Sequence, residues 1–231
     1  MTTTPEYLFD KHVTCQICAT SFITKKVLSR YIRANKHDTD FCSYYTKTSI
    51  NPLLYYVQVC PTCGFSSSEE FTSYFPPTTK EAIATAISEN WISTQLYSNE
   101  RSIDTAINSF KLAIYCATLK KEKHITLAGL YLRLSWIYRT EKVNSTEEQR
   151  FLRLALEEYV QSYMVSDYSE THLSEIRLLY LIGDLSRRIG LTTQATRYFS
   201  RVIEKQRDTL EKGIVEMAKD RWAEMREKKS G

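Results

Sequence analysis

The chain has 231 residues, a formal net charge of +4 at pH 7, 42% hydrophobic residues and only six glycines and five prolines. This length favours two domains, the scarcity of glycine and proline favours long regular elements, and the modest charge gives no electrostatic case for a dedicated nucleic-acid-binding protein. Because no segment resembles a signal peptide or approaches the ~18 apolar residues of a transmembrane helix, we expect a cytoplasmic protein with no membrane partner.

Residues 1–75 form the first predicted domain, in which two Cys-x-x-Cys pairs are the main feature. The pairs are Cys15-Gln16-Ile17-Cys18 and Cys60-Pro61-Thr62-Cys63. In a reducing compartment such pairs favour metal binding over disulfides, and two pairs supply the four thiolates that a tetrahedral zinc ion prefers. Four cysteines fill the coordination shell and leave no position for a reactive water. We therefore predict a structural Zn²⁺ site in a small zinc-ribbon-like β domain, with ligands Cys15, Cys18, Cys60 and Cys63.

Other cysteine chemistry stays open from the sequence. The two pairs also suit redox-active dithiols or unrelated buried cysteines. Cys42, with His37 and Asp40, suits a second metal or redox position, although an acidic turn followed by a small buried side chain explains the same residues. Exchange of Cys42 onto one of the pairs would make the protein a thiol or metal sensor.

The segment between the two pairs is predicted to hold an inserted β-hairpin or a longer excursion. Alternating apolar residues predict strands over residues 27–33 and 54–59, and the second leads into Cys60. A basic run also lies here, over residues 25–37, and consists of Lys25, Lys26, Arg30, Arg33 and Lys36. Such a surface suits phosphates, which makes a nucleic-acid-associated protein an alternative, but Arg30 and Arg33 would point to opposite faces of a strand.

Residues 76–231 form the second predicted domain, which begins at Pro76-Pro77 because proline interrupts regular structure. From Thr79 onward, apolar residues at three- and four-residue spacing predict seven helices, each with one apolar face. Their apolar series begin at Ile83, Ile103, Leu127, Leu152, Leu178, Ala195 and Ile214. The expected fold is therefore α+β, mostly α: a small β domain followed by a right-handed helical repeat with a C-terminal capping helix.

One part of the helical region resembles a tetratricopeptide unit. It is the run Tyr180-Leu181-Ile182-Gly183 followed by Gly190, Ala195 and Phe199. The first helix of each such unit lines a concave groove, and the register of this unit places Arg177, Tyr180, Asp184, Arg187 and Arg188 there. The same spacing in the preceding, partly matching unit places Trp136 and Arg139 in the groove. Arginines beside aromatic rings favour an acidic or carboxylate-bearing peptide, although the same side chains could face solvent or pack inside the protein.

Several segments together are similar to one protein family. They are Leu8-Phe9-Asp10-Lys11, Cys15-x-x-Cys18, Asp38-x-Asp40-Phe41-Cys42-x-Tyr44-Tyr45, Asn51-Pro52-Leu53-x-Tyr55, Val59-Cys60-Pro61-x-Cys63-Gly64 and Tyr180-Leu181-Ile182-Gly183-Asp184-Leu185-x-Arg187-Arg188-x-Gly190. The chain resembles a bacterial family of uncharacterised proteins, a domain of unknown function that is commonest in Firmicutes. The resemblance implies a bacterial cytoplasmic protein with a four-cysteine metal site and tetratricopeptide-like helices, and it implies no activity.

The leading hypothesis from the sequence is a non-enzymatic adaptor that binds a protein or peptide partner through its helical repeats. No nucleophile–base pair or phosphate-binding loop indicates catalysis. A nucleic-acid-associated protein that uses the basic run, and a thiol or metal sensor, are the alternatives.

Overall fold

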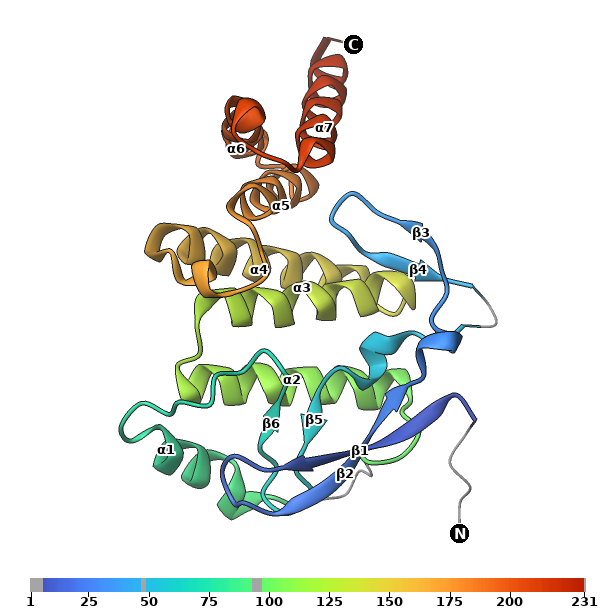
Figure 1. Ribbon diagram of the computed structural model, residues 1–231, viewed down its shortest axis with the longest axis vertical. Helices are drawn as coiled ribbons and strands as arrows, with labels where there is room; N and C mark the ends of the chain where they lie inside the picture. Colours follow the sequence, from blue (N-terminus) through green and yellow to red (C-terminus); the bar gives the residue numbers. More distant parts are fainter. Residues whose placement is uncertain (1–5, 47–48, 93–96, 231) are drawn as a thin grey trace. The chain divides into compact units, whose positions relative to one another are not determined.

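The computed structural model describes residues 6–46, 49–92 and 97–230. This part of the chain is mostly helical, with short antiparallel strand pairs near the N-terminus, which confirms the predicted α+β class (Figure 1). Its seven α-helices are α1 (Thr79–Ala86), α2 (Ile103–Lys120), α3 (His124–Thr140), α4 (Ser145–Val165), α5 (Glu175–Arg188), α6 (Thr192–Glu204) and α7 (Lys212–Ser230). Within these ranges, none of the helices combines the length and the apolar character needed to cross a bilayer.

Two compact units divide the chain. Unit 1 contains residues 1–37, 43–122 and 136–145, and unit 2 contains residues 38–42, 123–135 and 146–231. This division differs from the predicted domains 1–75 and 76–231. The reason is that α2 packs against the strands beside the second cysteine pair, so α1 and α2 belong with the cysteine-rich segment rather than with the later helices.

Six short strands in unit 1 form three antiparallel pairs: β1 (Leu8–Thr14) with β2 (Ser21–Val27), β3 (Ala34–His37) with β4 (Ser43–Tyr45), and β5 (Gln58–Val59) with β6 (Ser66–Ser67). The β3–β4 pair is the hairpin expected between the two cysteine pairs. Each cysteine pair lies in a turn between two paired strands, because Thr14 pairs with Ser21 and Val59 pairs with Ser66.

The strands predicted over residues 27–33 and 54–59 are mostly wrong. Strand β2 ends at Val27, and residues 29–31 form a 3₁₀ turn in which Ile32 N–H donates to the Ser29 carbonyl at 3.0 Å. Residues 52–55 form another 3₁₀ turn, and only Gln58–Val59 is extended. Asn51 caps that turn, since its side-chain oxygen accepts from Leu53 N–H, and this local hydrogen bond competes with strand formation.

Helix α2 provides the apolar face on which unit 1 is built. Ala106, Phe110 and Ala113 on this helix are fully buried, and the Phe110 ring stacks on Tyr56 with centroids 5.7 Å apart. The neighbouring Arg101 is only 4% exposed and donates to the carbonyl oxygens of Leu54, Val57 and Tyr97. Burial lowers its pKa to about 10. These hydrogen bonds to carbonyl oxygens offset the desolvation cost of the buried Arg101 cation, which was not singled out in the sequence.

Helices α5, α6 and α7 pack against one another in unit 2 (Figure 1). Gly183 on α5 faces Phe199 on α6 so closely that an added Cβ atom would lie 2.8 Å from the ring. Gly183 is buried and Phe199 is fully buried, so the small and large residues singled out in the sequence do interlock between two consecutive helices. Burial of this kind is the main source of helix stability in a protein, since short helices alone are marginal.

We predict that Gly183→Ala lowers the free energy of unfolding by about 1–3 kcal/mol, because the new methyl group overlaps the Phe199 ring. Gly213→Ala is the matched control: Gly213 lies in α7 and an added Cβ meets nothing within 4 Å. Alanine is the better helix former there, so the control is neutral or stabilises by up to about 1 kcal/mol. Equal urea-unfolding midpoints for the two variants would contradict the packing.

Candidate metal centre

The two Cys-x-x-Cys turns have the same backbone geometry. In the first, Cys15 N–H donates to the Thr20 carbonyl at 3.0 Å and Ala19 N–H donates to the Cys15 carbonyl at 3.1 Å. In the second, Cys60 N–H donates to the Phe65 carbonyl at 2.9 Å and Gly64 N–H donates to the Cys60 carbonyl at 2.9 Å. The residue after each pair is left-handed, with φ of 58° at Ala19 and 72° at Gly64. Each turn therefore directs two sulfur atoms to one side.

The four predicted ligands come together in unit 1. The sulfur atoms of Cys15, Cys18, Cys60 and Cys63 all lie within 4.8 Å of one another. The Cys15–Cys63 and Cys18–Cys60 sulfur pairs are each 3.6 Å apart, and all six cysteines of the chain are free thiols. Four sulfurs each about 2.3 Å from a tetrahedral metal ion are separated by about 3.8 Å, so the spacing is compatible with one ion at the centre. Four soft donors with no oxygen or nitrogen among them fit a thiophilic cation.

The pKa values of Cys15, Cys60 and Cys63 are shifted in different directions. The pKa of Cys15 is lowered to about 5, chiefly by the hydrogen bond from the Cys63 thiol, while burial and backbone N–H groups act in opposite directions on it. The pKa of Cys63 is raised, chiefly by the same bond to Cys15, and burial raises that of Cys60. The Cys15 thiolate thus forms readily, while Cys60 and Cys63 keep their protons unless a cation replaces them. Because protons compete for the same sulfurs, metal affinity falls as pH falls.

Trp91 supports the second turn and was not singled out from the sequence as part of the site. Its indole Nε1–H donates to the Pro61 carbonyl at 3.0 Å, and its ring covers Gly64, where an added Cβ would lie 2.4 Å from the ring. Glycine is therefore required at position 64 for two reasons: its backbone is left-handed, and the Trp91 ring leaves no space for a Cβ atom. The contact between Gly64 and Trp91 joins residues 27 positions apart in the chain, and no local sequence pattern predicts it.

Cys116 lies behind the second turn. This cysteine on α2 is fully buried and its sulfur accepts a hydrogen bond from Ser66 N–H on β6 at 3.2 Å. Burial raises its pKa to about 12, so it stays protonated near neutral pH. Cys116 therefore packs in the interior of unit 1 and also satisfies a backbone donor.

The basic run over residues 25–37 has carboxylate partners along much of its length. Lys25 pairs with Asp10 and Lys26 pairs with Glu69, while Arg30 lies 3.5 Å from Glu6. Lys36 lies over the Tyr44 ring, 5.0 Å from its centroid. Paired charges attract phosphates less than free ones, so the run is a weaker candidate nucleic-acid surface than its sequence indicated.

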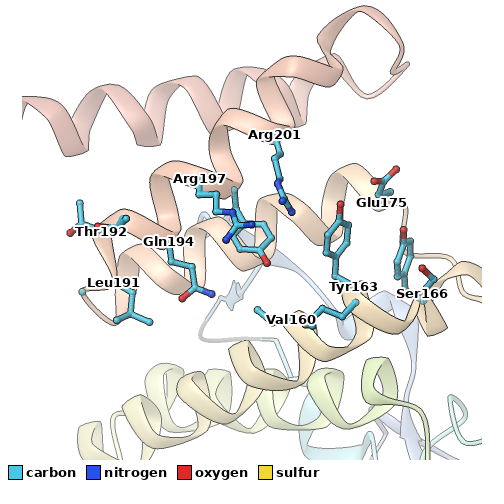
Figure 2. A pocket seen from close by; sticks show the side chains of 14 residues that line it. Val160, Tyr163, Ser166, Glu175, Leu191, Thr192, Gln194, Arg197 and Arg201 are labelled. Carbon is cyan, nitrogen blue, oxygen red and sulfur yellow. The ribbon is translucent and has the colours of Figure 1, made fainter.

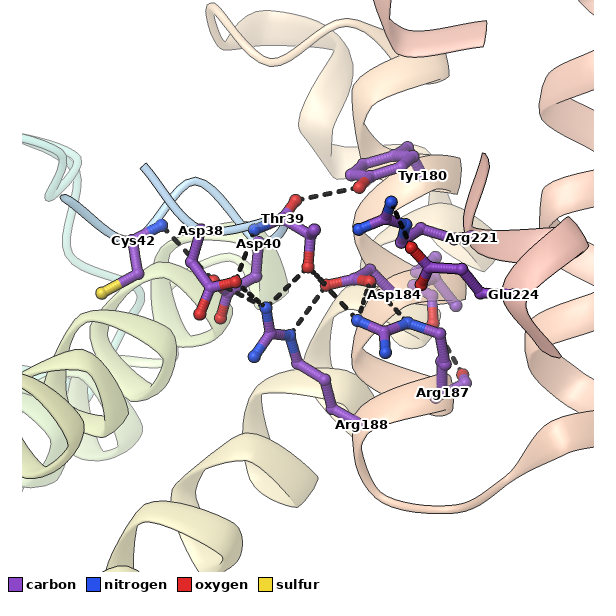
Figure 3. Close-up of polar contacts among 12 residues, drawn as sticks. Asp38, Thr39, Asp40, Cys42, Tyr180, Asp184, Arg187, Arg188, Arg221 and Glu224 are labelled. Carbon is purple, nitrogen blue, oxygen red and sulfur yellow. Dashed lines mark hydrogen bonds and ion pairs between the residues drawn. The ribbon is translucent and has the colours of Figure 1, made fainter. Parts of the chain in front are cut away.

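The segment Asp38–Cys42 lies against α5 within unit 2 (Figure 3). Arg188 donates to Asp38 at 2.7 Å and to Asp184 at 2.8 Å, and it lies 3.5 Å from Asp40. Burial lowers the pKa of Arg188, but the nearby carboxylates of Asp40 and Asp184 outweigh that effect and raise it. Arg187 binds the other oxygen of Asp184 at 2.7 Å. Two arginines and three carboxylates thus form one network, which we call the α5 arginine cluster.

Aromatic contacts complete this attachment. Tyr180 donates its hydroxyl to the Thr39 carbonyl at 3.0 Å and packs against Phe41, with ring centroids 5.6 Å apart. The Arg177 guanidinium lies over the Phe41 ring, 5.8 Å from its centroid. Phe41 has φ of 68°, a left-handed conformation that costs roughly 1–2 kcal/mol for a residue with a Cβ atom. The ring contacts and the cluster compensate this strain.

These contacts change the interpretation of the predicted groove. Tyr180 and Asp184 are fully buried, and Arg187 and Arg188 bind the chain's own acidic segment, so they do not line an open groove. Trp136 and Arg139 are half-buried on the part of α3 that belongs to unit 1. The predicted chemistry is present, since arginines and aromatics hold an acidic, aromatic segment, but that segment belongs to the same chain.

The three residues considered for a second metal or redox site have other contacts. Asp40 belongs to the α5 arginine cluster, Cys42 is fully buried, and His37 Nδ1 lies 3.0 Å from the Ser43 hydroxyl. Across residues 6–46, 49–92 and 97–230, the four cysteines are the one group of three or more His, Cys, Asp or Glu side chains close enough to hold a metal. A chemical role for Cys42 stays a prediction.

The sequence matches one family over residues 8–225, and that family is described as an uncharacterised protein conserved in bacteria, DUF2225. The chain belongs to this family. The match covers both cysteine turns and the α5 arginine cluster, which confirms the resemblance seen in the sequence. No curated protein and no solved structure matches the chain.

We predict that Gly64→Ala weakens metal binding and lowers the free energy of unfolding by about 2 kcal/mol or more, because the methyl group meets Trp91 and the left-handed backbone disfavours alanine. The counterpart is Ala19→Gly, which places glycine at the equivalent position of the first turn and changes stability by less than about 1 kcal/mol. Chelator competition and thermal unfolding measure both effects. Unchanged metal affinity in Gly64→Ala would contradict this account of the second turn.

We further predict that Arg188→Leu lowers the free energy of unfolding by about 3 kcal/mol, because it leaves three carboxylates short of a buried cation. Arg177→Leu is the control, since that side chain is 45% exposed and its pair with Glu211 lies near the surface, and it costs about 1 kcal/mol or less. Urea unfolding compares the two. Similar losses would mean that the α5 arginine cluster does not stabilise unit 2.

Proposed function

We propose that the protein is a non-enzymatic adaptor in which a structural zinc ion joins the two cysteine turns and the helical unit binds a protein or peptide partner. The four-thiol cluster supports zinc, because Zn²⁺ tolerates an all-sulfur tetrahedral shell and has no redox chemistry of its own. When bound, the ion supplies folding free energy, on the order of 10 kcal/mol for small zinc modules. Such a shell has no open position, so the cluster favours a structural over a catalytic ion.

A large open pocket in unit 2 is the single observation that carries the binding role. It has a volume of about 1120 Å³ and lies between α4, the start of α5 and α6 (Figure 2). Tyrosine and arginine side chains line it, and these two residue types dominate the binding energy at protein interfaces. The α5 arginine cluster is occupied by Asp38–Cys42, which leaves this pocket as the surface best suited to a partner.

The test is site-specific photo-crosslinking in bacterial cells that express the full chain. A benzoylphenylalanine at Leu191, on the pocket rim, should yield a discrete cross-linked protein, because that side chain is 46% exposed beside the pocket. The same group at Leu210, which is 99% exposed and outside the pocket, is the control and should yield none. The purified chain should also carry about one zinc ion. Absence of any product specific to Leu191 would contradict the adaptor function, and absence of zinc would contradict the metal assignment.

A further inference from the structure

We propose that the pocket between α4 and α6 binds an acidic peptide segment that carries an aromatic residue. The inference rests on the proposed adaptor function and adds the chemical class of its partner. Four features of the pocket support it: unpaired cations, tyrosine hydroxyls without partners, an elongated shape, and a precedent for the same recognition elsewhere in unit 2.

The pocket has an excess of positive charge. Arg197 and Arg201 line it, and neither forms an ion pair with any residue that the structure describes. Glu175 is the acidic residue of the lining, and it already accepts from Lys205 at 2.9 Å. The α6 N-terminus also borders the pocket, and its N-cap residue Leu191 provides no side-chain acceptor for the first N–H groups of the helix. A negatively charged group is the ligand that this lining lacks.

Arg201 is held in a position that leaves its hydrogen-bonding edge available. Its guanidinium lies over two rings, 5.7 Å from the Tyr163 centroid and 5.4 Å from the Tyr198 centroid. Tyr198 is 7% exposed, yet its hydroxyl makes no hydrogen bond to a residue in the described ranges. Stacking fixes the plane of a guanidinium while its N–H groups can still bind a carboxylate in bidentate fashion.

The shape favours a peptide over a small anion. A second hollow of about 360 Å³ adjoins the first and shares Val160, Leu191 and Gln194 with it. Together the two hollows follow α4 from Arg153 to Met164, which is roughly 16 Å of helix. An extended peptide covers that length with about five residues. Met164 is 69% exposed at one end, and a flexible thioether suits an aromatic side chain.

The same unit already shows this type of recognition. Arg188 of the α5 arginine cluster binds Asp38 at 2.7 Å, and beside the cluster Arg177 and Tyr180 contact Phe41. The recognised sequence is Asp38-Thr39-Asp40-Phe41, an acidic segment with one aromatic residue. The pocket presents arginines and tyrosines of the same kind without an occupant from the described chain.

The experiment is fluorescence anisotropy with the full zinc-loaded chain and a labelled peptide that has the sequence of residues 38–45 with Cys42→Ser. We expect saturable binding that weakens as salt rises, and about tenfold or greater loss in Arg197→Ala/Arg201→Ala, which corresponds to about 1.4 kcal/mol. The matched control is Arg33→Ala/Arg207→Ala, which removes two exposed arginines outside the pocket and should change affinity less than about twofold. Tyr198→Phe removes one hydroxyl and should weaken binding several-fold at unchanged melting temperature.

Several outcomes would overturn the inference. One is equal affinity for the peptide in which both aspartates are replaced by asparagine. Another is binding that survives Arg197→Ala/Arg201→Ala, which would assign the peptide to the α5 arginine cluster. A third is preferential binding of a short single-stranded RNA or of ATP as competing probes. If the peptide fails while Leu191 still cross-links a protein, the partner chemistry is wrong and the adaptor function stands. If no cross-link forms, the adaptor function fails even where the peptide binds.

Discussion

Unit 1 depends on four sulfur atoms held within 4.8 Å of one another. If all four lost their protons without a cation between them, their charges would repel at distances where the interior screens little. With protons retained, only weak thiol hydrogen bonds would hold the two turns together. A divalent ion would remove both difficulties, and the backbone of each turn directs its two sulfur atoms toward the place where that ion would lie. Trp91 supports the second turn from outside through the Pro61 carbonyl, and Cys116 accepts from Ser66 N–H on the strand that follows the turn.

Unit 2 depends on a different kind of interaction. Its α5 arginine cluster joins buried carboxylates to two arginines, and such a group stabilises a structure only when every charge has a partner. Asp38 and Thr39 complete the hydrogen bonding of this cluster, since both accept hydrogen bonds from Arg188. The left-handed Phe41 is then held by Tyr180 and Arg177. A segment between two strands thus serves as a structural ligand for a helix more than 130 positions away in sequence.

Two groups of arginine and tyrosine side chains in unit 2 differ in their partners. The α5 arginine cluster and the α4–α6 pocket use the same residue types, but only the pocket has arginines without carboxylates. The proposed binding role of the pocket rests on this difference, because a cation beside aromatic rings that lacks a carboxylate partner can still gain energy from an added anion. The four-thiol cluster of unit 1 would have no open coordination position around one metal ion, which fits a role in folding.

The sequence by itself determined the elements with strong local signals. Two Cys-x-x-Cys pairs in one chain favour a shared four-thiol site, and long three- and four-residue periodicity predicts helices, so the four cysteines and the seven helices could be named in advance. Short strands were predicted poorly at residues 27–33, because a local 3₁₀ hydrogen bond and not the alternating pattern decided that segment. The tertiary structure alone decided that Trp91 covers Gly64, that Arg101 is buried among carbonyls, and that Asp38–Cys42 occupies α5. These are contacts between residues far apart in the chain, and their energies depend on burial and exact charge partners that no local pattern records.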